Sequence, residues 1–338
     1  MGPIVAYSER LGQVTDIEEA LVTEFGATIR RVPLWSPAEV REHAADARIV
    51  LVGAVEPMDA AALAELRACE LLVRRGVGID NVDVPAATAL GLPVAFVPDA
   101  TVEEVSDHAL ALLLALERRI VALDRAVSRG DWSRDATVIA ASRRGMRRLE
   151  GLTLGIVGFG RIGQALARKA GSIFGAIVAF DPYATISAEV WPGVEQVDFE
   201  GLLERADLIS LHAPRTPEND HLFSSDAFAR MRPGAYIVNT SRGGLIDEAA
   251  LLEAVAAGRL AGAGLDVTER EPLPADSPLL GEERILVTGH SAASSASADR
   301  ELRARAVDAA RRALRGERPA AIADPSVFER PDCRLRLG

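Results

Sequence analysis

The feature that most constrains the fold is a glycine-spaced turn between an apolar strand and a helix. Residues 153–157 form the strand, Gly158, Gly160 and Gly163 follow in the spacing G-x-G-x-x-G, and residues 164–174 are predicted to be helical. The first glycine makes a tight turn, the second lets backbone approach a pyrophosphate, and the third lets the helix pack on the strand. The pyrophosphate would lie at the helix N-terminus, where unpaired N–H groups favour an anion. The residues predicted to contact a dinucleotide here are Gly158, Gly160, Arg161, Ile162 and Gly163.

A lone G-x-G-x-x-G is weak evidence, because many such runs are only structural turns. Here the next strand, residues 177–180, ends at Asp181, close to the offset at which an acidic residue binds the ribose hydroxyls. The Asp181 carboxylate would repel a 2′-phosphate, and Pro182 and Tyr183 supply no arginine to receive one. The sequence therefore favours dinucleotide binding over a turn, and NAD over NADP.

Strand-like and helix-like runs alternate on both sides of this motif, which predicts parallel sheets covered by helices on both faces. Residues 101–127 read as one long apolar helix capped by Asp99 or Thr101, and residues 133–151 as an arginine-rich connection across the surface. A helical tail over residues 299–315 is ended by Gly316. The other early strands are predicted at residues 4–7, 49–52, 70–73 and 93–97, with helices at 15–25, 58–67 and 85–90.

Length and composition fit a folded protein of two domains. The chain has 338 residues, of which 49% are hydrophobic and 26% charged, with a formal net charge of −11. That charge argues against a nucleic-acid partner. Cys69 and Cys333 are too few for a disulfide framework or a zinc site, and no metal is predicted. No targeting segment is visible, and the longest apolar run, residues 109–116, is far below the ~20 residues that span a bilayer. We expect a cytoplasmic protein without a membrane partner.

Four further segments resemble the D-isomer-specific 2-hydroxyacid dehydrogenase family, and the resemblance covers nearly the whole chain. They lie at residues 74–83, 231–247, 264–272 and 289–293. The resemblance implies two doubly wound parallel-sheet α/β domains of Rossmann-like or flavodoxin-like type, with the cofactor domain inserted into the substrate domain. The expected substrate domain comprises residues 1–100 and 291–338, and the expected NAD-binding domain residues 101–290.

The chemistry of a 2-oxo acid explains the residue types in these segments. Arg242 can contact carboxylate and carbonyl oxygens through its planar fork, which lysine would not reproduce. His290 would donate a proton during reduction and remove it during oxidation. Glu271 would orient the imidazole and raise its pKa. Glu269 is the rival for this role, but the family pattern places the acid directly before Pro272.

Other roles follow from the resemblance alone. The backbone N–H groups of Gly76, Val77 and Gly78 would bind the substrate carboxylate, and Arg74 would line the same pocket. Asp266 would hold the nicotinamide carboxamide. Thr240 and His212 would lie beside the cofactor, His212 through its backbone at most.

Purely structural roles are the alternatives to functional ones for several residues. Arg242 could simply satisfy the carbonyl groups of its turn. His43 and His108 are read as structural residues on helices, and His221 as a loop residue.

The chain departs from the family at two positions. Phe96 stands where many members carry Asn, and Ala293 stands where the related C-terminal-binding proteins carry an aromatic residue. Residues 102–108 resemble those relatives more than phosphoglycerate dehydrogenases, and the end at Gly338 leaves no room for the regulatory domain that many of the latter append. Arg75 and a cluster of arginines form either a solvated basic face or a site for a second anionic group on the substrate. The cluster comprises Arg134, Arg143, Arg144, Arg147 and Arg148.

The sequence thus predicts an NAD-dependent oxidoreductase that interconverts a 2-oxo acid and its D-2-hydroxy acid. An NAD(H)-responsive binding protein, like the corepressors of this fold, is the alternative from another class. Formate or phosphite oxidation fits less well, because formate dehydrogenases of this fold place Gln where Glu271 stands. A homodimer is expected, with residues 101–127 as the contact.

Overall fold

The chain forms two compact α/β units. In the computed structural model, which describes residues 2–338, the first unit comprises Met1–Thr101 and Ser295–Gly338 and the second comprises Val102–Ser294. The first unit holds both ends of the chain, so the second is an insertion into it. The two domain boundaries predicted from the sequence lie at residues 100/101 and 290/291.

The first unit is a five-stranded parallel sheet in the order β2-β1-β3-β4-β5. Its buried strand β3 is apolar at all four positions, as expected for a strand covered on both faces. The edge strand β2 was not predicted, since Arg30 and Arg31 interrupt its apolar pattern. The strands are β1 (Ile4–Ser8), β2 (Thr28–Val32), β3 (Ile49–Val52), β4 (Leu71–Arg74) and β5 (Val94–Phe96). The helices are α1 (Asp16–Phe25), α2 (Pro37–Ala44), α3 (Ala60–Glu65), α4 (Val84–Ala89) and α13 (Ala296–Leu314).

The second unit is a seven-stranded parallel sheet in the order β12-β11-β10-β9-β6-β7-β8. The strand order reverses between β6 and β9, and open α/β sheets bind ligands outside the carboxyl ends of the strands at such a switch point. The strands are β6 (Thr153–Val157), β7 (Ala176–Phe180), β8 (Val194–Gln196), β9 (Leu208–Leu211), β10 (Ala235–Asn239), β11 (Leu260–Leu265) and β12 (Ile285–Val287).

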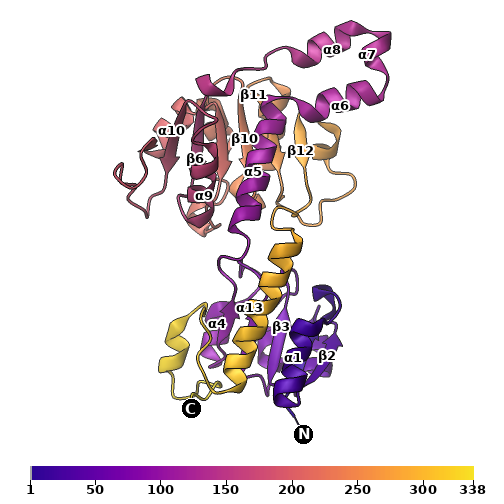
Figure 1. Cartoon of the computed structure of the whole chain (residues 1–338), viewed down its shortest axis with the longest axis vertical. Helices are drawn as coiled ribbons and strands as arrows, with labels where there is room; N and C mark the ends of the chain where they lie inside the picture. The colour runs from indigo at the N-terminus through magenta and orange to yellow at the C-terminus, as the bar shows by residue number, and fades with distance from the viewer. Residues whose placement is uncertain (1) are drawn as a thin grey trace. The chain divides into compact units, whose positions relative to one another are not determined.

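Helices cover both faces of this sheet. Helix α5 (Val102–Glu117) and α9 (Arg161–Ala170) share one core cluster with β6, while α10 (Phe199–Arg205), α11 (Ser225–Arg230) and α12 (Glu248–Ala256) share the other. Figure 1 shows α5 and α9 lying side by side over β6 and β10. Two doubly wound parallel sheets are thus confirmed as the fold.

The expected single helix over residues 101–127 is wrong, because it breaks into α5 and α6 (Ile120–Ser128). Arg119 takes a left-handed conformation with a φ of 51°, and three charged residues in succession, Glu117 to Arg119, leave no apolar side chain to continue the buried stripe. The connection that follows also holds two short helices, α7 (Asp131–Arg134) and α8 (Ala136–Arg143). Figure 1 shows α6, α7 and α8 as an arm that extends from the sheet of the second unit.

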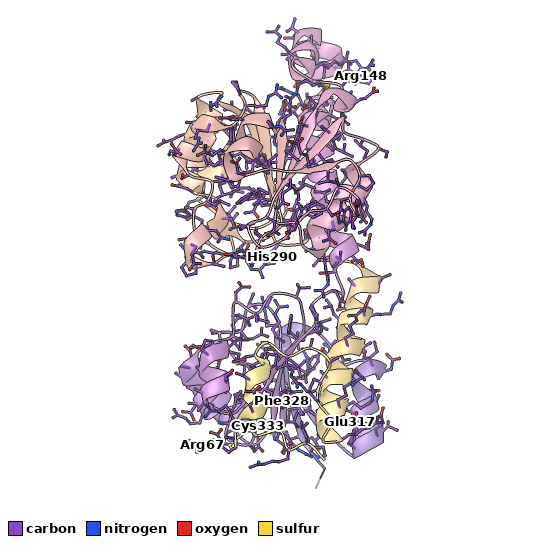
Figure 2. All side chains as sticks on the ribbon, turned by 90° about the vertical axis from the view of Figure 1, so that its left-hand side faces the viewer. Arg67, Arg148, His290, Glu317, Phe328 and Cys333 are labelled. Atoms are coloured by element: carbon purple, nitrogen blue, oxygen red, sulfur yellow. The ribbon has the colours of Figure 1, made fainter. Side chains whose placement is uncertain are left out.

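Arg147, in the arginine cluster of residues 134–148, does not lie at the carboxyl edge of its own sheet. Arg147 donates to the buried carboxylate of Glu117 and pairs with Asp207, which lies just before β9 and accepts from the Thr153 amide at the start of β6. These contacts place it at the amino ends of the strands. Figure 2 shows Arg148 and His290 at opposite ends of the second unit. The hypothesis that the cluster binds a second anionic group of the substrate stays a prediction.

The sequence predicts no metal site, no disulfide framework and no membrane-spanning segment. Within residues 2–338, no group of three or more His, Cys, Asp or Glu side chains is arranged to hold a metal ion. Cys69 and Cys333 are both buried and free. A search of the described helices finds none with the length and apolar character needed to cross a membrane.

Candidate active site

The glycine turn after β6 has the geometry that a dinucleotide requires. Gly158 has a φ of +86°, and a Cβ there would lie 2.7 Å from the carbonyl of His212; a Cβ at Gly163 would lie 2.2 Å from the Gly158 oxygen. Helix α9 begins at Arg161, three residues before the predicted start, with Gly160 as its N-cap and no side chain capping its amides. Those amides are available to an anion.

Asp181 follows β7 and is tied to the glycine turn. Its Oδ2 accepts from the Phe159 amide at 2.8 Å, and its Oδ1 accepts from the amides of Tyr183 and Ala184 at 2.9 and 3.1 Å. Three backbone donors hold the carboxylate in one place beside the turn. The residue expected to bind ribose is therefore preorganised next to the expected pyrophosphate site.

Two buried polar atoms lie at the carboxyl ends of neighbouring strands. Leu211 of β9 and Asn239 of β10 are register partners, so His212 and Thr240 come next at the same edge. The Nδ1 of His212 and the Oγ1 of Thr240 are buried without a hydrogen-bond partner. Burial lowers the pKa of His212 to about 3, so its ring is neutral. Unpaired buried polar atoms are costly unless a ligand satisfies them, which fits a cofactor bound over this edge. The ring of His212, and not only its backbone, thus offers a ligand contact.

His290 follows β12 and hydrogen-bonds to Glu271. The Nδ1 of His290 lies 2.7 Å from Glu271 Oε2, and both side chains are about half exposed. The hydrogen bond to Glu271 raises the pKa of His290, against the opposing effects of burial and of the nearby Arg242 cation. Burial disfavours the charged form of Glu271, but the bond to His290 outweighs it and the pKa of Glu271 is lowered. Both shifts favour the imidazolium–carboxylate form of the pair.

Glu269, the rival acid, faces elsewhere. Its Oε1 accepts from the Glu248 amide at 2.9 Å and lies 3.3 Å from the Nε2 of His221. The Glu269 amide in turn donates to Glu248 Oε1 at 2.6 Å. Glu269 and Glu248 thus tie the loop after β11 to the start of α12, while Glu271 alone of the two acids contacts His290.

The backbone around His290 is held by Asp266, whose side chain is buried. Asp266 Oδ1 accepts from the Ser291 amide and Oδ2 from the Ala292 amide, each at 2.9 Å. The Asp266 carbonyl oxygen accepts from the His290 amide at 2.6 Å. Asp266 therefore shapes the loop that carries His290. The contact with the nicotinamide carboxamide that the resemblance implies stays a prediction.

Arg242 lies in the loop after β10, at the same edge. Its Nη1 donates to the Ser241 carbonyl at 2.6 Å, so the turn-satisfying role accounts for part of its hydrogen bonding. The neighbouring Gly243 is a residue that the sequence reasoning missed. A Cβ at Gly243 would lie 2.0 Å from the backbone of Thr268, so glycine is required where the Arg242 loop meets the segment that carries Glu271.

The predicted carboxylate loop belongs to the first unit and starts at the end of β4. Gly76 has a φ of +157°, and the Arg74 guanidinium lies so close that a Cβ on Gly76 would be 1.5 Å from its Nη1. The loop is held to β5, since the Val97 amide donates to the Gly76 carbonyl at 3.0 Å. Val77 and Gly78 follow in the same loop, both partly exposed.

Asn81 and Arg75, two residues in or beside this loop, make contacts that were not predicted from the sequence. Asn81 donates to the carbonyls of Gly53 and Glu56 and so joins the loops after β3 and β4, a contact that the sequence reasoning missed. Arg75 donates to the Leu11 carbonyl at 3.2 Å and pairs with Asp299 at 3.5 Å. Phe96 ends β5, partly buried, in register with Arg74, and Ala293 lies in the loop beyond His290.

Known proteins resemble the chain in both sequence and structure. Residues 110–292 match the model of the D-isomer specific 2-hydroxyacid dehydrogenase, NAD binding domain. D-3-phosphoglycerate dehydrogenase of Mycobacterium tuberculosis is 41% identical over 272 residues, which are 80% of this chain and 50% of that protein. The chain spans about half the length of the curated relatives it matches.

Solved structures match over nearly the full length. D-lactate dehydrogenase from Escherichia coli, in its apo form, is 31% identical with a TM-score of 0.77, covering 95% of this chain and all of that one. The holo form of D-mandelate dehydrogenase from Rhodotorula graminis is 27% identical with a TM-score of 0.86, covering 95% of this chain and 97% of that one. The chain therefore belongs to the D-isomer specific 2-hydroxyacid dehydrogenase family and carries its NAD-binding domain.

Proposed function

We propose that this protein is an NAD-dependent oxidoreductase that interconverts a 2-oxo acid and its D-2-hydroxy acid. The observation that carries the proposal is the His290–Glu271 pair, joined at 2.7 Å and placed at the carboxyl edge of the sheet whose glycine turn fits a dinucleotide. A proton donor of raised pKa beside a bound nicotinamide is what carbonyl reduction requires.

His290 is the acid of the reduction. Because its Nδ1 is engaged by Glu271, Nε2 is the nitrogen that exchanges a proton with substrate. When bound, NADH supplies the hydride to the carbonyl carbon. His290 donates its Nε2 proton to the carbonyl oxygen, and the neutral imidazole that results is the base for the reverse direction.

Arg242 orients the substrate and stabilises charge on its oxygens. A guanidinium can hold a carboxylate oxygen and the carbonyl oxygen together, which fixes the carbonyl for attack. Glu271 holds the imidazole in one orientation and favours its protonated form. In the first unit, the amides of Gly76, Val77 and Gly78, with Arg74, bind the substrate carboxylate.

The cofactor is NAD because Asp181 stands where a 2′-phosphate would need a cation. The carboxylate is held by three backbone amides, so it cannot turn away from the ribose site without losing those bonds. Thr240 and His212 then satisfy their buried polar atoms against the cofactor.

The substrate class that we propose is a 2-oxo acid with a second anionic group. The M. tuberculosis relative at 41% identity is named for a phosphorylated 2-hydroxy acid, which supports this choice. Arg75 has a carbonyl and a carboxylate as partners, and Arg148 lies at the end of the second unit opposite His290. Arg74, whose guanidinium lies beside Gly76 in the predicted carboxylate loop, is the cation to test first. Equal kcat/KM for the 2-oxo acid of 3-phosphoglycerate and for pyruvate would rule out a second anionic group.

The experiment follows NADH loss at 340 nm against a panel of 2-oxo acids, with NADPH in parallel. Arg242→Ala and His290→Ala serve as inactive variants, and His43→Ala on α2 serves as a matched control. We expect NADH-dependent turnover that both site variants lose and the control keeps. Tight NADH binding without turnover of any acid would contradict the enzyme and favour an NAD(H)-responsive binding protein.

We further propose that the protein is a homodimer that pairs through α5 and the arm formed by α6, α7 and α8. Three apolar side chains of this arm, Ile120, Val127 and Trp132, are 55%, 44% and 67% exposed. Such a surface is costly in contact with water. Light scattering at micromolar concentration should give the mass of two chains, and a monomer would contradict the proposal.

A further inference from the structure

The histidine on α5, His108, lies next to the loop that carries His290. Its Nε2 is 2.9 Å from Thr288 Oγ1 and 3.6 Å from Asp266 Oδ1. The sequence analysis read His108 as a structural residue of its helix, and nothing in the proposed mechanism uses it. The side chain is only one-quarter exposed, so its polar edge is directed at these two neighbours.

The hydroxyl of Thr288 determines which group donates and which accepts in each hydrogen bond of this contact. Thr288 Oγ1 lies 2.6 Å from Asp266 Oδ1, and a carboxylate only accepts, so the hydroxyl proton goes to Asp266. The hydroxyl then has only lone pairs left for His108, which must donate from Nε2. The result is a directed chain from His108 through Thr288 to Asp266.

Asp266 is the residue that shapes the His290 loop. Its side-chain oxygens accept from the amides of Ser291 and Ala292, and its carbonyl accepts from the His290 amide. His290 itself has a φ of 55°, a left-handed conformation that is unfavourable for a residue with a side chain. Such a conformation persists only where its surroundings enforce it, and Asp266 supplies the bonds that do so.

We propose that His108 is a positioning residue for His290, acting through Thr288 and Asp266. The Nε2–H of His108 fixes the Thr288 hydroxyl so that its proton points at Asp266 Oδ1. Asp266 is then held against the amides on either side of its loop, and His290 is held with its Nδ1 on Glu271. This inference rests on the proposed role of His290 in catalysis.

Loss of this chain should also change the titration of His290. The groups that act on His290 are Glu271, Asp266 and Arg242; the two carboxylates raise its pKa and the guanidinium lowers it. If the Asp266 carboxylate shifts away from His290, the effect of one of the two raising charges is reduced. The pKa of His290 should fall while the hydrogen bond to Glu271 remains possible.

The test compares His108→Leu, which removes the donor, with His108→Gln, which keeps an N–H at similar reach, and with Thr288→Val. We expect His108→Leu to lower kcat on the order of tenfold, because the orientation of His290 changes. His108→Gln should recover most of that loss. The double variant His108→Leu/Thr288→Val should match Thr288→Val alone, because both changes break one chain.

A second readout does not need a substrate. Titration of the His290 ring by NMR in the free protein should show a lower pKa in His108→Leu and in Thr288→Val than in wild type and His108→Gln. If no 2-oxo acid is turned over at all, this titration still decides the inference separately from the proposed function. His43→Leu, on α2 of the first unit, is the matched control and should leave the His290 pKa unchanged.

Three results would overturn the inference. His108→Leu with wild-type kcat and wild-type His290 pKa would show that the contact has no effect on the site. Equal losses in His108→Leu and His108→Gln with a lowered Tm would show a merely structural role. Additive losses in the double variant would show that His108 does not act through Thr288. Should His108→Leu fail to fold, Thr288→Val must still lower the His290 pKa, or the inference is wrong.

Discussion

The two edges of the seven-stranded sheet use the same kinds of side chain in opposite ways. At the amino edge, the buried Glu117 carboxylate accepts from the Arg147 amide at 2.6 Å and from its Nη2 at 2.7 Å. Asp207 there accepts from Arg147, Arg232 and the Thr153 amide. At the carboxyl edge, the Nδ1 of His212 and the Oγ1 of Thr240 are buried without partners.

The difference separates stability from function. Charges at the amino edge are matched by opposite charges within the chain, so they hold α5, β9 and the segment after the arm together. Polar groups at the carboxyl edge are left partly unmatched, which costs stability unless a ligand completes them. The residue types alone would make both edges candidate sites. Only the hydrogen-bond and ion-pair partners of the side chains distinguish the two edges.

The largest effect should come from the catalytic pair at the carboxyl edge. His290→Asn, chosen because Asn tolerates the positive φ of this position, should lower kcat by about 10³-fold. Its Tm should stay close to that of wild type, because the side chain is about half exposed. Steady-state kinetics and thermal unfolding on the same samples check this. A large loss of Tm with a small loss of kcat would reverse the assignment of this edge.

Breaking the amino-edge pair should do the opposite. Arg147→Met leaves the Glu117 carboxylate buried without its cation, which should cost about 3–5 kcal/mol of unfolding free energy. Urea unfolding measures the loss, and kcat of the remaining folded protein should be unchanged. Glu117→Gln/Arg147→Met, which removes both charges, should recover part of the stability. A kcat that falls in proportion to stability would mean that this edge takes part in the reaction.

A smaller effect is expected from Glu271→Gln, read as a pH profile. Glu271 raises the pKa of His290 above its ordinary 6.5, so oxo-acid reduction should be highest at low pH and fall as pH rises through that raised pKa. Glu271→Gln should move the fall to lower pH and cost about tenfold in kcat/KM above neutrality. An unchanged profile would remove Glu271 from its role.

The same pair sets the sign of a stability change with pH. The contribution from His290 is complete below the unfolded-state pKa and is lost as pH rises through the raised folded-state value. The contribution from Glu271 is present above its unfolded-state pKa and is lost as pH falls through its lowered value. Between those two folded-state values the ion pair is intact.

The smallest effect should come from Asp181→Asn. The substitution removes the negative charge to which three backbone amides donate. The repulsion of a 2′-phosphate disappears with it. We expect the preference for NADH over NADPH to fall by about tenfold, with kcat on NADH little changed. Parallel KM determinations for both cofactors test this, and an unaltered preference would place cofactor choice in other residues.

Much of the fold could be predicted, because it depends on local pattern. The apolar run at β3 and the glycine turn after β6 each predict their element from a few residues. Strand β2 was missed because an edge strand needs only part of its surface buried and can carry Arg30 and Arg31. The break at Arg119 was missed, and Glu117, two residues before it, is buried against Arg147 from thirty residues away, a contact that no local pattern reveals.

The site residues divide in the same way, into those that short motifs predict and those that only tertiary packing brings together. Short motifs identified Arg242, Glu271 and His290, and the structure joins the last two at 2.7 Å. The chain from His108 to Asp266 could not be predicted, because its members are 180 and 22 residues apart and meet only through the packing of α5 on β11 and the loop after β12. Arg147 gives a second example, since its contacts with Glu117 and Asp207 join residues 30 and 60 positions apart that no local motif connects.

The central claim is that the carboxyl edge of this sheet carries out hydride and proton transfer to a 2-oxo acid. The most direct test supplies NADH with deuterium at both C4 positions together with the best 2-oxo acid of the panel, and analyses the product by mass spectrometry and chiral chromatography. We predict one deuterium at C2 of a D-2-hydroxy acid in wild type, and formation of the same product about 10³-fold more slowly in His290→Asn. Loss of NADH without deuterium at C2, or equal product from the His290→Asn variant, would contradict the account.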